Sequence, residues 1–197
     1  MLPAGDVELI QIVNRELADA TARGGKWLVC RPGCDQCCTG VFRISALDVE
    51  RIRAGLASLT VSDAARAEAV RVRVKASVEA LSPDYPGDVE TGMLYDDEDS
   101  VELFSEFADE AVCPVLDPAT GTCDLYAARP MTCRTFGPPV RLADESYGVC
   151  ELCFIGAPAA VIAEAEMYPP PEELEAALTA EAGPPMETVV AFALNGY

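Results

Sequence analysis

The chain has 197 residues, half of them apolar and 24% of them charged, which suits a single folded domain and excludes wholesale disorder. Thirty-three acidic residues against fourteen basic ones give a net charge of −19, so neither nucleic acid nor an anionic membrane is an expected partner. No apolar run reaches the roughly 18 residues of a membrane helix, and the start does not resemble a signal peptide, which predicts a soluble, cytoplasmic protein.

The first part of the chain predicts helices on either side of a cysteine-rich loop. Apolar residues at helical spacing predict an amphipathic helix over residues 7–22. Residues 30–38, the first cysteine block, have no helical period and should form a loop folded around something. Ser45 followed by Asp48 has the pattern of a capping box that starts a second helix, and Ser62 is expected to cap a third.

The second half of the chain predicts a loop-rich region followed by further helices. The acidic run 96–99 does not have the spacing of an EF-hand, so it predicts a solvated loop. The second cysteine block, residues 113–153, contains a short strand, a turn and a second strand. Residues 157–194 predict a helical extension in which 189–194 fits a helix or a strand.

These elements define the expected fold class. The pattern favours a mainly α protein with a loop-rich, cysteine-clustered centre and a few short strands, that is, a small α+β fold. Residues 1–197 are expected to form one domain organised by metal.

The chain contains nine cysteines and no histidine, which limits its chemistry more than any other count. The missing imidazole excludes Ser-His-Asp and Cys-His nucleophilic machinery in its usual forms. It also excludes mixed cysteine–histidine zinc fingers and histidine-ligated haem. A metal bound by this chain should therefore be held by sulfur, with help from carboxylates or the backbone.

Metal ligation explains the cysteine set better than three other readings. Disulfides are not expected in a reducing cytosol, and nine cysteines cannot all form pairs. Buried thiols that act as small apolar residues are isolated, whereas these cysteines cluster. A redox-active CxxC motif lies at a strand-to-helix junction, and neither CxxC motif of this chain has a convincing one. Two thiolates three positions apart can bind one metal ion, as in Cys34/Cys37 and Cys150/Cys153. The candidate metal ligands are Cys30, Cys34, Cys37, Cys38, Cys113, Cys123, Cys133, Cys150 and Cys153.

The adjacent pair Cys37 and Cys38 bears on the number of centres. In an extended backbone, neighbouring side chains point to opposite sides, so a single ion would use one of the two more comfortably than both. Two sites of four thiolates would use eight cysteines and leave one, whereas one site would leave five. This favours polynuclear or paired centres.

With these residues in view, the sequence resembles the YkgJ-type CxxCxxCC cysteine-cluster family, a zinc- or iron-chelating domain. The resemblance is carried by Cys30 to Cys38, the segment 41–45 and Asp48, and then by Cys113-Pro-x-Leu, Gly121-x-Cys123-x2-Tyr126 and Arg129-Pro-x2-Cys133-Arg134-x-Phe136. Three residues rather than two separate Cys30 from Cys34, and Cys150 and Cys153 lie beyond both motifs. The resemblance implies metal chelation. Some relatives belong with flagellin lysine N-methylases, in which such a cluster is thought to hold iron and sulfide.

Side chains around the cysteines are candidates for supporting a metal centre. Guanidinium groups of Arg129 and Arg134 could offset thiolate charge and donate to sulfur, or else form surface salt bridges. Tyr126 fits the same surroundings but suits core packing better, and Trp27 is expected to cover the cluster loop.

Several functions are compatible with this pattern. The first is a metal-binding protein with an iron–sulfur cluster, most simply [4Fe–4S], or zinc, in a structural or redox role. The second is a metal- or cluster-dependent enzyme, for example a protein-modifying one, and the third is a labile metal sensor or chaperone. The sequence names neither a substrate nor a protein partner.

Overall fold

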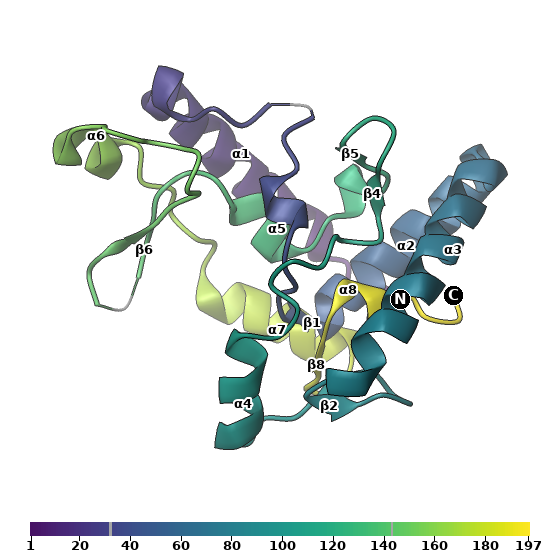
Figure 1. The fold of residues 1–197 in the computed structure, drawn as a ribbon. Coiled ribbons are helices and arrows are strands. Elements are labelled where there is room, and N and C mark those ends of the chain that lie inside the picture. The colour runs from purple at the N-terminus through teal and green to yellow at the C-terminus, as the bar shows by residue number, and fades with distance from the viewer. Residues whose placement is uncertain (32, 143) are drawn as a thin grey trace.

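The computed structural model describes residues 1–31, 33–142 and 144–197. Over this part of the chain the structure is mainly helical, and its strands are two residues long and form antiparallel pairs, which confirms the predicted fold class. Figure 1 shows α2 and α3 side by side on one flank of the molecule and α1 and α6 on the other, with α5 between them. No helix in the described ranges is both long and apolar enough to cross a membrane.

The elements follow one another in this order. The α-helices are α1 Asp6–Gly24, α2 Ala46–Ser62, α3 Ala64–Leu81, α4 Glu98–Ser105, α5 Met131–Thr135, α6 Ala159–Glu164, α7 Glu172–Ala182 and α8 Val190–Leu194. The strand pairs are β1 Ile44–Ser45 with β8 Glu187–Thr188, β2 Gly87–Asp88 with β3 Met93–Leu94, β4 Leu116–Asp117 with β5 Thr122–Cys123, and β6 Val140–Arg141 with β7 Tyr147–Gly148. Short 3₁₀ helices cover Gly25–Trp27, Gln36–Cys38, Ser82–Asp84 and Tyr126–Ala128.

Helix capping sets where α2 and α3 begin. The predicted capping box is present, because Ser45 Oγ accepts from the Asp48 backbone N–H at 3.2 Å and the Asp48 carboxylate accepts from the Ser45 N–H at 3.4 Å. The prediction that Ser62 caps α3 is wrong. Helix α2 continues through Ser62, whose hydroxyl donates to the Ser58 carbonyl at 3.1 Å, and the Asp63 carboxylate caps α3 by accepting from the Arg66 N–H at 3.0 Å.

The acidic run 96–99 is exposed to solvent, as predicted, but residues 97–99 form the start of a helix instead of a loop. The Asp97 carboxylate accepts from the Ser100 backbone N–H at 3.0 Å, and Glu98 and Asp99 lie in the first turn of α4. Negative charge is favoured at this position because the first N–H groups of a helix carry partial positive charge. Hydrogen bonds from the Ser100 hydroxyl, at 2.7 Å, and from the Ser100 N–H hold the pKa of the Asp97 carboxyl below its usual value.

The main hydrophobic core lies between α2, α3 and α8, so residues 189–194 contribute a buried helix to it. Its largest members include Ile44, Ile52, Leu56, Val70 and Leu194. A Cβ on Gly55 of α2 would lie 2.4 Å from the Ala128 Cβ, which real contacts do not tolerate. Glycine there lets the 3₁₀ helix Tyr126–Ala128 lie directly on α2, and this fixes the middle of the second cysteine block against the core.

A buried polar network joins the starts of α1, α2 and α5. The Asp48 Oδ1 atom accepts from the Met131 backbone N–H at 2.9 Å and from Arg51 Nη1 at 2.7 Å. Arg51 Nε also donates to Asp6 Oδ1 at 2.8 Å, and all three charged side chains are buried. Because Met131 begins α5, this network sets the position of Cys133 one half-turn later.

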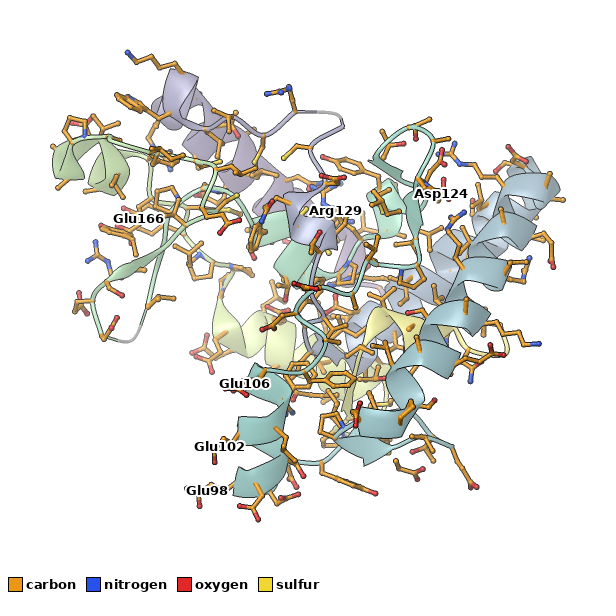
Figure 2. All side chains as sticks on the ribbon, in the orientation of Figure 1. Glu98, Glu102, Glu106, Asp124, Arg129 and Glu166 are labelled. Carbon is orange, nitrogen blue, oxygen red and sulfur yellow. The ribbon has the colours of Figure 1, made fainter. Side chains whose placement is uncertain are left out.

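Two arginines of α3 hold the β4–β5 hairpin in place. The Asp124 carboxylate follows β5 and accepts from Arg73 Nη2 at 2.5 Å and from Arg66 Nε (Figure 2). Arg73 Nε donates in addition to the Pro114 carbonyl at 2.9 Å. The arginines on α3 therefore position the backbone on both sides of the hairpin, next to Cys113 and Cys123.

On the opposite flank, Glu166 anchors the β6–β7 pair. Its carboxylate accepts from Arg141 Nε at 3.0 Å and from the Tyr147 hydroxyl at 2.9 Å, and its backbone carbonyl accepts from Arg23 of α1 at 2.7 Å (Figure 2). The Met167 N–H also donates to the Pro139 carbonyl at 2.7 Å. These contacts fix the chain just before the last two cysteines.

Replacement of Asp48 tests the buried network. We expect Asp48→Ala to lower the free energy of unfolding by about 3–5 kcal/mol, because Arg51 loses one of its two buried partners and the Met131 N–H loses its acceptor. The control Asp63→Ala removes only an exposed cap and should cost about 1 kcal/mol. Urea unfolding monitored by circular dichroism measures both, and equal losses would contradict the clamping role of Asp48.

Candidate metal centre

All nine cysteines are unpaired thiols, so the disulfide alternative finds no support in the described structure. The thiols interact with one another in two separate sets. The five-thiol group consists of Cys37, Cys38, Cys113, Cys123 and Cys133. The four-thiol group consists of Cys30, Cys34, Cys150 and Cys153. Each group combines cysteines of both blocks.

Backbone pairing brings the two blocks together at the five-thiol group. The Cys113 N–H donates to the Cys38 carbonyl at 2.8 Å, and the Gly40 N–H donates to the Ala111 carbonyl at 2.9 Å. Thr39 and Val112 form an isolated antiparallel bridge between these two bonds. Cys38 and Cys113 are thus held together by the main chain, independently of any ligand.

The adjacent cysteines lie in a 3₁₀ helix, so the premise that they point to opposite sides is wrong. In a 3₁₀ helix successive side chains are about 120° apart rather than on opposite faces. The adjacent Cys37 and Cys38 thiols influence each other's ionisation directly. The interaction with Cys38, together with a hydrogen bond from the backbone and the charge of Arg129, lowers the pKa of Cys37 to about 6, whereas the pKa of Cys38 is raised. Both thiols therefore belong to one group.

The remaining thiols of this group are difficult to ionise. Burial raises the pKa of Cys113 to about 12 and raises the pKa values of Cys123 and Cys133 as well. Repulsion from the other thiolates adds to the effect of burial at each position. Several buried sulfurs thus share a region that needs positive charge before they can all ionise.

Arg129 supplies part of that charge, while Tyr126 does not take the predicted packing role. The Arg129 guanidinium lies over the Tyr126 ring at 4.0 Å from its centroid and donates to the Tyr126 carbonyl at 3.1 Å. Arg129 is buried in the middle of the molecule (Figure 2), and its charge favours the thiolate forms of Cys37 and Cys123. The Tyr126 ring is 63% exposed because it covers Arg129 instead of entering the core.

Arg134 supports the site through the backbone. It donates to the Arg129 carbonyl at 3.1 Å, to Asn14 Oδ1 at 3.2 Å and to the Ala127 carbonyl. Burial, with repulsion from Arg129 and Arg51, lowers its pKa to about 10. Among the described residues, its hydrogen bonds go to these oxygens and not to sulfur, and neither arginine forms the alternative surface salt bridge.

The four-thiol group is built from two tight turns. The Cys34 N–H donates to the Arg31 carbonyl at 2.9 Å, and the Cys153 N–H donates to the Cys150 carbonyl at 2.8 Å. The Sγ atoms of Cys30 and Cys153 are 3.7 Å apart. Partial desolvation of its sulfur and the neighbouring Cys153 raise the pKa of Cys30 to about 12. Cys150 and Cys153 are buried, whereas Cys30 lies at the surface.

Gly137 and a backbone hydrogen bond between Phe154 and Trp27 bring Cys30 close to the other cysteines of the four-thiol group. A Cβ on Gly137 would lie 3.0 Å from the Cys30 sulfur, and its φ of +126° disfavours other residues. The Phe154 N–H donates to the Trp27 carbonyl at 2.8 Å, and the Trp27 side chain packs against the apolar cluster that contains Cys150 and Cys153. Trp27 therefore covers the end of the second block.

Of the two cysteine pairs that their spacing predicts to bind one metal ion, one lies together in the structure and the other does not. Cys150 and Cys153 lie together, as their spacing suggested. Cys34 and Cys37 interact with different partners, Cys34 within the four-thiol group and Cys37 within the five-thiol group. No three Cys, Asp or Glu side chains of the described residues are arranged so that they could hold a metal ion as they stand. The thiols are gathered but not oriented as ligands.

Sequence reasoning missed two residues that position the thiols. Asp124 binds Arg66 and Arg73 of α3, and the sequence signal for this contact was an acid beside a cysteine together with two arginines two helical turns apart. Gly137 follows the family's aromatic position, but no sequence pattern indicated that a sulfur lies against it.

A chain that gathers nine thiols and no imidazole from two distant blocks has the donor set of a cysteine-rich metal-chelating protein. A family model described as "CxxCxxCC: Putative zinc- or iron-chelating domain" matches residues 29–153, a range that contains every cysteine. The chain belongs to this CxxCxxCC family. Comparisons with curated proteins and with solved structures gave no match.

Thiol cross-linking of the metal-free protein tests the division into two groups. We expect dibromobimane to join Cys30 to Cys153, because their sulfurs are 3.7 Å apart and Cys30 is accessible. Peptide mapping by mass spectrometry identifies the linked residues, and Cys30→Ser provides the control that removes this product. Dominant links between Cys30 and the five-thiol group would contradict the arrangement.

Proposed function

We propose that this protein binds metal at two sulfur-ligated centres, an iron–sulfur cluster at the five-thiol group and zinc at the four-thiol group. The observation that carries the proposal is that the thiols gather in two places. In one, Cys38 and Cys113 are joined by a backbone hydrogen bond, and Cys113 and Cys123 pack against the main core. In the other, the Cys30 and Cys153 sulfurs are 3.7 Å apart, and Cys150 and Cys153 share an apolar cluster. The family's zinc- or iron-chelating description supports metal binding in general. The assignment of the two centres is our inference from their surroundings.

The five-thiol group fits a cluster better than a single ion. A [4Fe–4S] cluster takes four cysteine thiolates, which leaves one of the five as a spare. The site already provides conditions that favour an anionic centre, namely the buried charge of Arg129 and a thiol at Cys37 with a lowered pKa. When bound, such a cluster supplies one-electron transfer, with a potential that depends on burial and nearby charge.

The four-thiol group fits a structural zinc ion. The turn from Cys150 to Cys153 provides two sulfurs, and Cys30 and Cys34 of the first block provide two more; four cysteine sulfurs are the closed ligand set of many structural zinc sites. Cys30 and Cys34 would join the loop after α1 to the turn at Cys150 and Cys153. Zinc there would replace packing that this loop-rich part of the chain lacks, with about 10–16 kcal/mol of binding free energy.

Metal binding at either centre would require the cysteine side chains to change their orientation and the thiols to lose their protons. Cys113 and Cys30 have pKa values of about 12 in the metal-free protein, so their thiols are protonated at neutral pH. A bound cation reverses this cost because it stabilises the thiolates electrostatically. Metal binding should therefore release protons and strengthen as the pH rises.

The cavity beside Cys113 is small. A hole of about 20 Å³ lies beside Cys113, which is smaller than any organic substrate. The larger groove of the described structure, between α3 and α4, contains no cysteine in its lining. The protein-modifying and metal-sensor alternatives thus have no observation that favours them over stable metal binding.

Serine variants of each group test the two-centre proposal. We expect Cys133→Ser, purified without oxygen, to lose most of its iron and acid-labile sulfide and to keep its zinc, because it removes a ligand of the five-thiol group only. Cys153→Ser should lose zinc and keep iron and sulfide. Elemental and sulfide analysis per chain measures these contents.

Each variant is the control for the other, because both replace a half-buried or buried thiol by an isosteric hydroxyl. Circular dichroism of both proteins shows whether a loss of metal follows from global unfolding. Loss of all metals in both variants would mean one shared centre, and unchanged metal contents would remove these cysteines from the ligand set.

A further inference from the structure

A groove outside the cysteine region lies between the end of α3 and helix α4. Its volume is about 810 Å³. Its lining combines apolar side chains with the carboxylates of Asp84, Asp99, Glu102 and Glu106. No cysteine contributes to it, so its role is independent of the proposed metal centres.

The floor of the groove is apolar and rigid. Leu81 and Phe107 are buried and belong to one hydrophobic cluster, in which the Phe107 and Tyr85 rings meet edge to face at 5.8 Å. Leu103 stands at the edge of this floor and is 66% exposed. An exposed leucine beside an open, preformed apolar floor provides contact area for another apolar side chain.

The rim of the groove is acidic on both sides. Asp84 ends the 3₁₀ helix Ser82–Asp84 that follows α3, Asp99 and Glu102 lie on α4, and Glu106 directly follows α4. None of these four carboxylates has a salt-bridge partner among the described residues. Figure 2 shows Glu98, Glu102 and Glu106 in one row along α4, the spacing of successive helical turns.

Basic residues of this chain do not neutralise the rim. Residues 76–128 contain fourteen acidic residues and no Lys or Arg. Arg43 contacts α4, where it lies over the Phe104 ring at 4.6 Å from the centroid, but its charge is paired with Glu187 at 2.8 Å. The groove therefore combines an apolar floor with uncompensated negative charge.

We propose that this groove docks a basic amphipathic helix of a partner protein. Such a helix would place an apolar side chain against Leu81, Leu103 and Phe107, and Lys or Arg residues one turn apart against Glu102 and Glu106. Charge complementarity identifies the occupant, because an acidic rim repels nucleic acid, anionic membranes and other acidic proteins. The apolar floor distinguishes this ligand from a small polycation.

Peptide binding to the full-length protein tests the proposal. The probe is a fluorescein-labelled peptide of two Leu-Lys-Lys-Leu-Leu-Lys-Lys repeats, which forms a helix with leucines on one face. A second peptide has the same composition in an order without an apolar face. Fluorescence anisotropy at low and at moderate ionic strength measures both affinities, and we expect the amphipathic peptide to bind about tenfold more tightly.

Matched variants locate the binding site. Glu102→Gln/Glu106→Gln should weaken binding of the amphipathic peptide about fivefold to tenfold at low salt, and Leu103→Ser should weaken it at both salt concentrations. The control Asp19→Asn/Glu164→Gln makes the same change in net charge on α1 and α6, which lie at the other end of the molecule from α4 (Figure 1). We expect the control to change affinity less than about twofold.

Two results would overturn the proposal. Equal weakening by the rim variant and the α1/α6 control would show that the peptide senses only the net charge of the protein. Equal affinity for the two peptides would show that the apolar floor makes no contribution, and that the rim attracts any polycation. Metal content is unaffected in either case, so failure here leaves the metal-binding proposal standing.

Discussion

The structure depends on one constraint, which is the meeting of two cysteine blocks that lie far apart in the chain. Closing so long a loop costs conformational entropy, although the cost grows only slowly with loop length. The N–H of Cys113 and the carbonyl of Cys38 make the direct link between the blocks. Helices α2 and α3 hold the second block in place, through the bond of Asp48 to Met131 and the bonds of Arg66 and Arg73 to Asp124.

The charge distribution gives the five-thiol group surroundings that differ from the rest of the protein. The chain is strongly acidic, yet the thiols of the five-thiol group lie beside the buried cation Arg129. Its neighbour Arg134 is directed to backbone carbonyls and Asn14, which fixes the position of Arg129 and leaves its charge to the thiols. One arginine cannot balance several thiolates, and metal cations provide the additional positive charge that such a group requires.

Local sequence signals predicted the parts of the fold that depend on neighbouring residues. The capping box at Ser45 and Asp48, the helices and the β4–β5 hairpin follow from such signals. The same signals failed where tertiary contacts decide. Ser62 is a suitable capping residue, but α2 continues through it and Asp63 caps α3 instead. Tyr126 is aromatic, as many core residues are, but its ring covers Arg129 at the surface.

The candidate site could be predicted as a set of residues but not as an arrangement. Clustering and the absence of histidine identified all nine cysteines as one donor set. Spacing alone could not show that Cys34 and Cys37 join different groups, because the 3₁₀ helix Gln36–Cys38 turns the chain between them. Nor could it show that Asp48 binds the first N–H of α5, since that contact joins residues 83 positions apart.

X-ray absorption at the zinc and iron edges of the protein purified without oxygen tests the central claim most directly. Sulfur ligation at two centres predicts a zinc shell of four sulfurs at about 2.3 Å and an iron shell that also contains only sulfur, with iron neighbours typical of a cluster. A metal shell dominated by oxygen or nitrogen, or a protein that binds neither metal, would contradict the account.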